Sequence, residues 1–288
     1  MSKAERFFFS YQTLYSINLK VKLIEPLHVG SGKESVSPIE PDNPVLRDTR
    51  NEPIIPGSTL KGFFRSNFER FASSVYGVQI AEKLGQLAFG SKDDKNPRCS
   101  CMFFPDLHIL DGVMPYTELR DHVYIDRSTG GVSNKYDLEV VRENNVFAGV
   151  INVRNIPPSH LSCLLPVVKL ANIGLARLGG SKSRGYGQVR LEINDIILRL
   201  IGRTKPIRNT ISNDLGIFGS VTYTIEEGTN GFSVTEKYEN GTLSFSFVAS
   251  IDEKNNELFF STLRIDNGEA FLESAASSFD KFVSSVRQ

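Results

Sequence analysis

Alternation of apolar and polar side chains over residues 17–23 constrains the fold of this chain more than any other feature. The apolar positions are Ile17, Leu19, Val21 and Leu23. Successive side chains of a β-strand point to opposite faces of the sheet, so a period of two predicts a strand with one buried face. The same pattern returns in residues 189–193, where Val189, Leu191 and Ile193 are apolar. Both segments are predicted to be half-buried strands.

Helical periodicity begins after Pro56-Gly57-Ser58, where Ser58 is the predicted N-cap. The apolar face of this helix consists of Leu60, Phe63, Phe64, Phe68, Phe71 and Ala72. Residues 159–178 predict a second helix, which Pro166 starts or kinks and which Gly179 and Gly180 stop. A strand, two helices and a second strand together predict an α+β fold with an antiparallel sheet, of the ferredoxin-like or RRM-like kind.

Three further regions have a different character. Residues 29–56 form a Gly-, Ser- and Pro-rich loop that is too long to be only a connection. Residues 122–148 are polar with a turn at Gly130-Gly131, which predicts a protruding hairpin. Beyond Pro206, strand-like stretches lead into an amphipathic helix at residues 269–286, and this region is either a small appended domain or an elaboration of the first one.

Composition indicates a globular protein that is expected in the cytoplasm. Of its 288 residues, 40% are hydrophobic and 23% are charged, and neither a signal peptide nor an apolar run of membrane-spanning length is evident. The net charge of zero divides unevenly. Residues 205–288 hold 7 Lys and Arg against 12 Asp and Glu, which leaves 26 against 21 for residues 1–204. A site for a polyanion is therefore expected in the first part, at net charge +5, and not in the acidic second part.

The glycine-rich segment Gly179–Gly187 combines backbone freedom with positive charge. Glycine permits positive φ and close approach of a ligand, so free amide groups can bind phosphate oxygens while Lys182 and Arg184 supply cations. The alternative is a tight connection between helix and strand whose charges face water. The segment lacks the Gly-x-Gly-x-x-Gly pattern of dinucleotide sites, and Gly30–Glu34 fails the Walker A pattern because Leu27 and Glu34 occupy required positions.

Several other polar residues each have two interpretations. Lys61 and Arg65 could bind a phosphate near a helix N-terminus, or they could face water with an Arg65–Glu69 pair. His28 could be a general base or a phosphate contact, or a hydrogen-bonded structural residue. Asp42 and Asp48 could cap turns, or one could hold a divalent ion or assist attack by an RNA 2′-hydroxyl. Three residues, Cys99, Cys101 and His108, could be zinc ligands, but their spacing favours structural thiols.

Together these segments resemble the RAMP superfamily of CRISPR proteins, and specifically the backbone subunit of type III (Csm or Cmr) effector complexes. The resemblance rests on three pieces in order: Leu27–Gly30, Pro53–Arg65 and Leu178–Gly187. It covers about the first 190 residues and leaves residues 205–288 uncovered. It implies an RRM-like RAMP core at 1–204, with an inserted thumb hairpin at about 121–147, and a C-terminal extension at 205–288.

The resemblance also implies partners and RNA-binding residues. The expected partners are the guide RNA (crRNA), the target RNA, further copies of the chain and other effector subunits, all acting in antiviral defence and without a membrane. The residues that the family pattern assigns to RNA are His28, Ser58, Lys61, Arg65, Arg127, Gly179, Gly180, Ser181, Lys182, Ser183, Arg184 and Gly185. Arg127 lies in Ile125-Asp126-Arg127, the part of the thumb that matches best.

A catalytic role for Asp42 follows from the same resemblance, because cleaving members carry an aspartate before a small polar residue and Pro-Val. Here Asp42 is followed by Asn43-Pro44-Val45, with Asn43 where serine is commoner. The implied reaction is endonuclease cleavage of target RNA with a divalent cation, expected to be Mg²⁺. Two alternatives stay open: a crRNA-binding scaffold that does not cut, and a stand-alone endoribonuclease that processes CRISPR repeats with a base such as His28.

Overall fold

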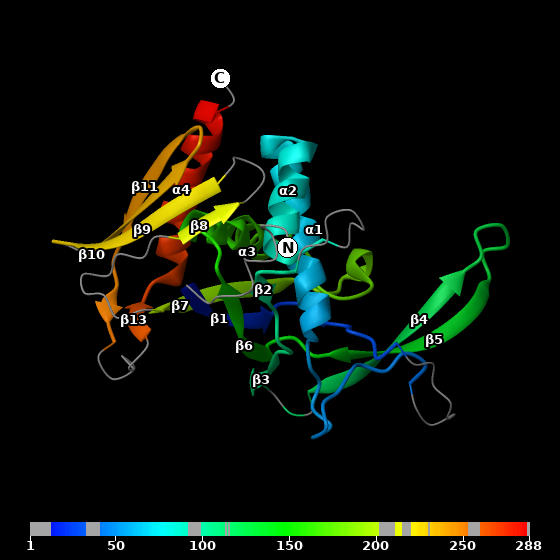
Figure 1. Ribbon diagram of the computed structural model, residues 1–288. Coiled ribbons are helices and arrows are strands. Elements are labelled where there is room, and N and C mark those ends of the chain that lie inside the picture. The colour runs from blue at the N-terminus through cyan, green and yellow to red at the C-terminus, as the bar shows by residue number, and fades with distance from the viewer. Residues whose placement is uncertain are drawn as a thin grey trace.

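The computed structural model describes residues 13–32, 41–91, 99–112, 114, 116–201, 211–214, 220–229, 231–252 and 260–286. It is a mixed α/β protein with antiparallel sheets (Figure 1). The largest sheet has seven strands in the order β12-β13-β7-β1-β6-β2, with β3 also paired to β6. Its strands are β1 (Thr13–Leu23), β2 (Met102–Phe103), β3 (His108–Asp111), β6 (Val146–Arg154), β7 (Val189–Ile201), β12 (Ser250–Ile251) and β13 (Phe260–Ile265).

Strand β1 lies at the centre of this sheet and confirms the prediction for residues 17–23. It is antiparallel to both neighbours, with Ile17 opposite Ile151 of β6 and Leu19 opposite Ile193 of β7. The apolar side chains at alternate positions are buried, while the intervening ones are half-buried or exposed. Because a slip of one residue would exchange the two faces, the alternation fixes the register. The strand predicted at 189–193 extends further, to Ile201 in β7.

Helices α1 (Gly57–Tyr76), α2 (Val78–Phe89) and α3 (Leu164–Asn172) lie over one face of the sheet (Figure 1). The apolar face of α1 is buried as predicted except at Phe71, which is half-buried. Ser58 is not the N-cap of this helix. Pro56 takes that position, and the Gly57 N–H donates instead to Oδ1 of Asp106 at 2.8 Å. Ser58 is exposed within the first turn. The cap therefore comes from a segment distant in sequence.

The second predicted helix is shorter than residues 159–178. A 3₁₀ helix, η2 (Pro158–Cys163), precedes α3, which ends at Asn172 before Gly174 at φ 79°. Pro166 lies in the first turn of α3, where the missing N–H costs nothing. The prediction that Gly179 and Gly180 stop this helix is wrong, because the chain leaves the helical conformation at Gly174.

Strands β4 (Thr117–Ile125) and β5 (Val132–Val141) form a two-stranded hairpin that projects from the body of the protein (Figure 1). Its base is buried through Leu138, Val140 and Val141, whereas its outer part is exposed. The hairpin begins before the predicted position 121. It also ends before 147, because residues from Val146 onward pair with β1 as part of β6.

The C-terminal region completes the large sheet and adds a second one. Strand β13 pairs with β7, and a four-stranded sheet consists of β8 (Ile211–Asp214), β9 (Ser220–Gly228), β10 (Gly231–Tyr238) and β11 (Gly241–Phe247). Helix α4 (Gly268–Val286) packs against β11 and η2. Buried hydrogen bonds join this region to the rest: the Thr13 and Tyr223 hydroxyls lie 2.8 Å apart, and Ser159 Oγ donates to Glu236 at 2.6 Å.

None of the helices described is both long and apolar enough to cross a membrane.

Candidate nucleic-acid interface

The glycine-rich segment forms one wall of a groove of about 490 Å³. The segment that follows β1 contributes His28, Val29 and Gly30 to the lining, and one face of α1 contributes Thr59, Gly62 and Ser66. Four residues predicted to bind RNA therefore come together here: His28, Gly179, Gly180 and Lys182. Three segments that are far apart in the sequence make a single concave surface.

Glycine is required at position 179 by the close approach of the loop to the backbone of His28. Gly179 has φ 79°, and a Cβ atom there would lie 2.3 Å from the backbone oxygen of His28. The Gly180 N–H donates to that same oxygen at 2.8 Å. By contrast, a Cβ at Gly185, which has φ 84°, would meet open space. The first glycines hold the loop against the segment that contains His28, and the later part of the loop is free to face a ligand.

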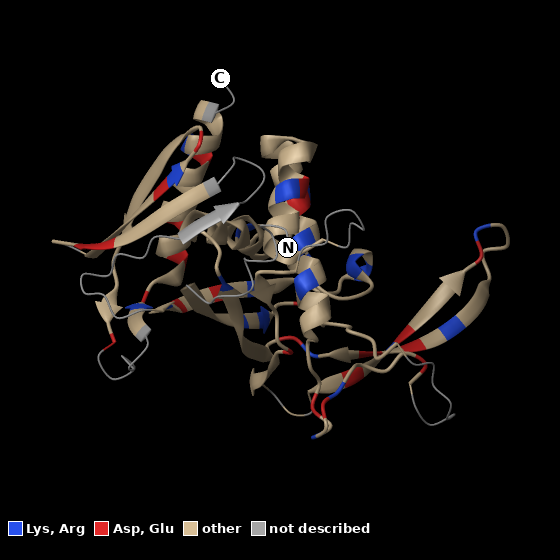
Figure 2. Ribbon diagram, viewed as in Figure 1, with Lys and Arg blue, Asp and Glu red and all other residues tan. Residues whose placement is uncertain are grey.

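The outer part of the loop carries the positive charge. Ser181 adopts the left-handed conformation, and a 3₁₀ turn over Lys182–Arg184 follows, with Lys182, Ser183, Arg184 and Gly185 exposed. Figure 2 shows Lys and Arg on this turn and on the neighbouring part of α1. Exposed cations beside a concave surface suit a polyanion.

His28 has one ring nitrogen engaged inside the protein. Its Nδ1 atom lies 2.8 Å from the backbone oxygen of Glu139, and because a carbonyl only accepts, Nδ1 must carry the hydrogen. In the neutral ring, Nε2 is then a hydrogen-bond acceptor. This histidine thus satisfies the structural interpretation and also lines the groove.

Ser58, Lys61 and Arg65 are on α1 but do not line the groove. Arg65 Nε donates to Glu69 Oε1 at 2.8 Å, and a guanidinium NH group donates to the Gly90 backbone oxygen at 3.2 Å, so the predicted Arg65–Glu69 pair is present. Burial, followed by the charge of Arg65, lowers the pKa of Lys61. These cations flank the groove.

Aromatic side chains that sequence analysis missed connect the loop to the hairpin. Arg184 donates to the Tyr136 hydroxyl on β5, and the Tyr136 ring stacks on His122 of β4 at a centroid distance of 5.3 Å. His122 Nε2 lies 2.9 Å from the hydroxyl of Tyr186. Tyr186 was visible within the glycine-rich segment, but its contact with His122 depends on how the hairpin folds.

The predicted catalytic residue Asp42 lies at the base of the hairpin. Its exposed carboxylate accepts the Asp137 N–H at 3.0 Å through Oδ2. Asn43 makes two backbone hydrogen bonds with β5: its N–H donates to the backbone oxygen of Asp137, and its backbone oxygen accepts the N–H of Glu139. Glu139, only 8% exposed, accepts the Val45 N–H and forms an ion pair with Arg47. The loop that carries Asp42 is thereby fixed to the hairpin.

Carboxylates gather around Asp42. The pKa of Asp137 is raised, first by its hydrogen bond with Asp121 and also by the charges of Asp121 and Asp42. The Lys135 ammonium lowers the pKa of Asp121 and lies 3.1 Å from it. Within the described ranges, no group of three or more His, Cys, Asp or Glu side chains is arranged to hold a metal ion.

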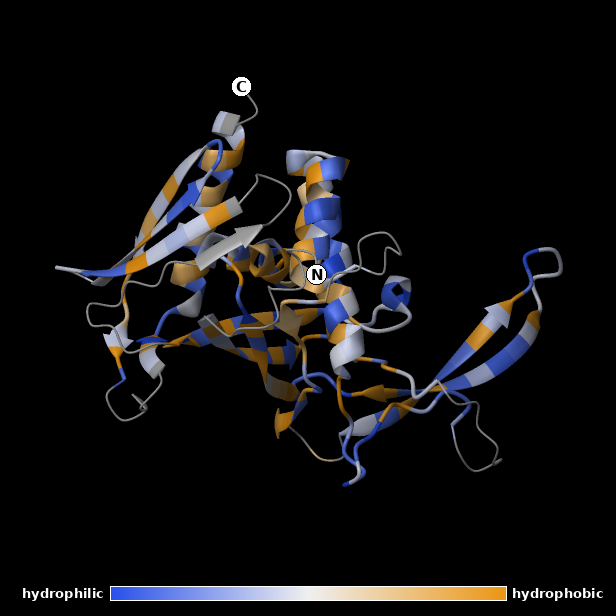
Figure 3. Cartoon of the chain, in the orientation of Figure 1, coloured by the Kyte–Doolittle hydropathy of each residue, from blue (hydrophilic) through white to orange (hydrophobic). Residues whose placement is uncertain are grey.

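Other candidate residues lie outside these surfaces. Asp48 accepts hydrogen bonds from the N–H groups of Arg50 and Glu52 and so caps a turn. The hydrogen bond from Glu52 is the main reason why the pKa of Asp48 is lowered. Of the possible zinc ligands, Cys101 is 1% exposed within the core and Cys99 is exposed. Arg127 is exposed in the turn at the tip of the hairpin. The apolar residues Leu119, Val123 and Ile125 on β4 are also more than half exposed. Figure 3 shows hydrophobic segments within the projecting hairpin.

Residues 20–190 match the model of the RAMP superfamily. Three curated relatives carry the name "CRISPR system Cms endoribonuclease Csm3". The protein from Streptococcus thermophilus is 31% identical over 191 residues, covering 60% of this chain and 84% of the relative. The protein from Methanocaldococcus jannaschii is 28% identical, with 59% and 75% covered. The protein from Enterococcus italicus is 28% identical, with 62% and 89% covered.

A chain of a solved structure, described as "Type III-B Cmr-beta Cryo-EM structure of the Apo state", is 15% identical. The superposition has a TM-score of 0.45 and covers 62% of this chain and 96% of that chain.

Proposed function

The chain belongs to the RAMP superfamily, and from this premise we propose that it is a backbone subunit of a type III CRISPR effector complex. It binds the guide RNA and cleaves complementary target RNA at regular intervals. The observation that carries the proposal is that the family match, residues 20–190, includes the groove, the Asp42 loop and the hairpin. The three relatives, each similar to this chain over about 190 residues, are named endoribonucleases.

We infer that the core is a modified ferredoxin-like domain. Four of its strands are adjacent in the order β7-β1-β6-β2, with antiparallel neighbours. If the hairpin and β3 are set aside, β1, β2, β6 and β7 are the first to fourth strands of the core along the chain. Their order in the sheet is then fourth, first, third, second. Helix α1 follows the first strand and α3 follows the third, which supports the assignment. Residues 205–288 are then an acidic extension, and its negative charge suits contact with protein partners better than contact with RNA.

The guide RNA is bound in the groove by backbone contacts. Free amide groups of the glycine-rich loop and the ammonium group of Lys182 contact phosphates, while His28 Nε2 accepts a hydrogen bond from a ribose 2′-hydroxyl. Such contacts do not depend on base identity. That property suits a subunit that must hold many different guides, alongside further copies of itself and other subunits in the cytoplasm.

Cleavage is assigned to Asp42, which is exposed at the hairpin base and held there by Asp137. A carboxylate in this position can accept a proton from the target 2′-hydroxyl or orient a divalent cation. Asp42 and Asp137 would supply oxygen ligands of the kind that Mg²⁺ prefers, and phosphate oxygens of the target would have to complete its coordination. When bound, the cation would neutralise charge that develops on the phosphate.

The test uses the assembled complex with its guide, complementary RNA and Mg²⁺. Asp42→Asn keeps an oxygen that can accept the Asp137 N–H, so the loop stays in place while the carboxylate is lost. We expect target cleavage to fall by at least about a hundredfold, the usual contribution of acid–base catalysis, with unchanged target binding. Asp111→Asn, at an exposed aspartate of β3, is the matched control and should cut normally.

Normal cleavage by Asp42→Asn would overturn the catalytic assignment. Absence of cleavage by the unmodified complex would instead favour the non-cutting scaffold, in which Asp42 serves only the hydrogen bond to Asp137. The stand-alone processing enzyme has support of its own, because His28 Nε2 is placed to act as a base in the groove. That function requires the purified chain to cut repeat RNA, and His28→Gln to stop it.

A further inference from the structure

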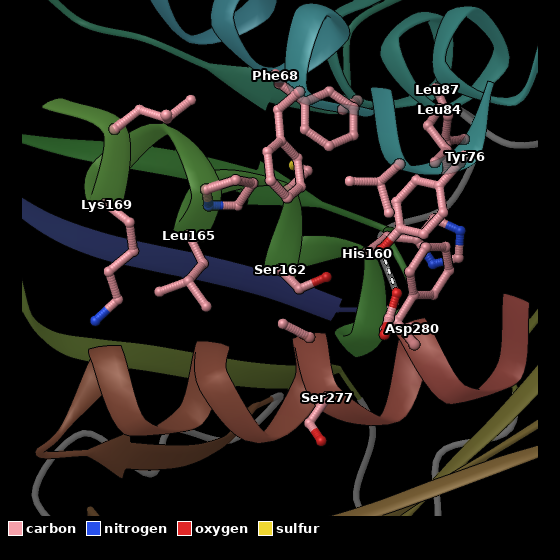
Figure 4. Close-up of a pocket in the computed structure, with 18 of the residues that line it drawn as sticks. Phe68, Tyr76, Leu84, Leu87, His160, Ser162, Leu165, Lys169, Ser277 and Asp280 are labelled. Carbon is pink, nitrogen blue, oxygen red and sulfur yellow. Dashed lines mark hydrogen bonds between the residues drawn. The ribbon is translucent and has the colours of Figure 1, made fainter. Parts of the chain in front are cut away.

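A second cavity, of about 550 Å³, lies away from the groove and shares no lining residue with it. It is enclosed by α1 and α2 on one side, and by η2, α3 and α4 on the others (Figure 4). Small-molecule sites in proteins usually have volumes of about 300–1,000 Å³ and mostly apolar walls with a few polar groups. The size of this cavity falls within that range.

The walls are largely aromatic and aliphatic. Phe68, Phe71 and Tyr76 come from α1, and Phe279 from α4. The Tyr76 and Phe279 rings pack edge to face at 6.1 Å, and the Phe279 ring lies 5.0 Å from His160. An apolar cavity holds water poorly, so an apolar ligand that enters it loses little hydration of the walls.

The charged groups at the ends of the cavity are already hydrogen-bonded within the protein. At one end the Tyr76 hydroxyl donates to Asp280 at 3.3 Å, with His160 beside them (Figure 4). At the other end Lys169 donates to Glu269 at 2.6 Å and to Glu273 at 2.9 Å. The ammonium of Lys169 is already paired, so the lining disfavours a phosphate group or a nucleotide, and its largely apolar walls favour an uncharged molecule.

One polar atom of the wall is left without a partner. His160 is 4% exposed, and its Nε2 atom has no hydrogen bond to any residue that the structure describes. Its Nδ1 atom lies 3.1 Å from Ser159 Oγ, whose hydrogen is donated to Glu236. Nδ1 must therefore donate to Ser159, which leaves Nε2 as an unprotonated acceptor. A buried acceptor of this kind calls for a donor.

We propose that this cavity binds a small, uncharged and largely apolar molecule that donates a hydrogen bond to His160 Nε2. The aromatic walls hold the apolar body of the ligand, and the imidazole fixes its orientation. The site is separate from the RNA groove. Its ligand would bridge the α1–α2 pair and the C-terminal helix α4, and would stabilise their packing.

The experiment titrates the full-length chain with N-phenyl-1-naphthylamine, an uncharged fluorophore with one N–H donor, and follows its emission. We expect saturable binding of one equivalent. In Ala276→Trp, the new side chain fills the cavity from α4 and should abolish binding. Lys281→Trp places the same side chain on an exposed position of α4 outside the cavity and should bind normally.

His160→Phe keeps a ring of similar size but removes the acceptor. This substitution should weaken the binding of N-phenyl-1-naphthylamine about five- to tenfold, as expected for the loss of one hydrogen bond. The binding of 1-benzylnaphthalene, which has no N–H, should not change. Equal weakening of both probes would overturn the role of His160. Absence of saturable binding to the unmodified chain, or unchanged binding to folded Ala276→Trp, would overturn the site itself.

Discussion

Lys182 and Arg184 carry the positive charge of the glycine-rich loop, but their surroundings differ. Lys182 lines the groove, whereas the Arg184 guanidinium donates to the Tyr136 hydroxyl of the hairpin. A phosphate that binds Arg184 must compete with this hydroxyl. Arg184 therefore connects the two parts of the interface, and Lys182 contributes mainly charge.

Replacing both cations with alanine should weaken RNA binding to the same extent for unrelated sequences, because phosphate contacts carry no base information. The slope of log affinity against log salt should flatten by about 1.4, since each lost contact to single-stranded RNA releases about 0.7 fewer counterions. Filter binding at several salt concentrations measures both quantities. The matched control is Lys83→Ala with Lys281→Ala, two exposed lysines outside the groove. An unchanged slope in the loop variant would contradict phosphate binding.

His160 should make the stability of the protein depend on pH. Burial lowers its pKa to about 3, below the value of about 6.5 expected when the chain is unfolded. The unfolded chain then binds more protons, so the stabilising contribution is complete above pH 6.5 and is lost as the pH falls toward 3. Nearby Glu236 has the opposite effect, because burial raises its pKa, and its contribution is lost as the pH rises.

Comparison of the unmodified chain with His160→Phe isolates the histidine, since Glu236 is present in both. Between pH 7 and pH 5 the unmodified chain should lose about 2 kcal/mol more of its free energy of unfolding, because about 1.5 pH units lie between 6.5 and 5 and each contributes about 1.4 kcal/mol. Urea unfolding at the two pH values provides the measurement. Parallel losses in the two proteins would show that His160 does not titrate as its burial requires.

Among the elements, helix α1 has a different N-cap from the one that the sequence predicted. Asp106 accepts the first N–H of the helix and places a negative charge at its positive end. Asp106→Ala should lower the free energy of unfolding by about 1 kcal/mol, a typical value for a lost cap. Ser58→Ala, in the same turn without a capping bond, should change it by less than about 0.5 kcal/mol. Equal losses in a urea titration would restore Ser58 as the cap.

Elements with a strong period were predictable, and those defined by a distant partner were not. The alternation in β1 and the apolar face of α1 are local properties of neighbouring residues, and both were confirmed. The end of α3 was misplaced because Gly174 at positive φ interrupts a segment whose composition stays apolar beyond it. The end of the hairpin was misplaced because pairing with β4 stops at Val141, and residues from Val146 onward pair with β1.

At the scale of the whole molecule, the C-terminal region shares its core with the RAMP part. β13 pairs with β7, Tyr223 contacts Thr13, and Ser159 donates to the fully buried Glu236. A boundary near residue 204 divides the charge of the chain. The hydrogen bonds and the sheet nevertheless cross it.

This continuity predicts one cooperative thermal transition for the entire chain. Tyr223→Phe, which removes a buried hydrogen bond between the two parts, should lower the free energy of unfolding by about 1 kcal/mol and keep a single transition. Scanning calorimetry measures the number of transitions and their midpoints. Two separate transitions, with only one moved by the substitution, would show that the parts fold independently.

The sequence by itself determined strands β1 and β7, the amphipathic α1, and a glycine-rich loop with two cations in a chain of zero net charge. These follow from periodicity, charge and backbone freedom, which act between residues close in the chain. Only the tertiary structure decided that His28, α1 and Gly179–Lys182 share one groove, that Asp42 sits against β5, and that His160 lines a separate cavity. Such contacts join residues far apart in the chain, and they depend on strand register and packing, which no local pattern encodes.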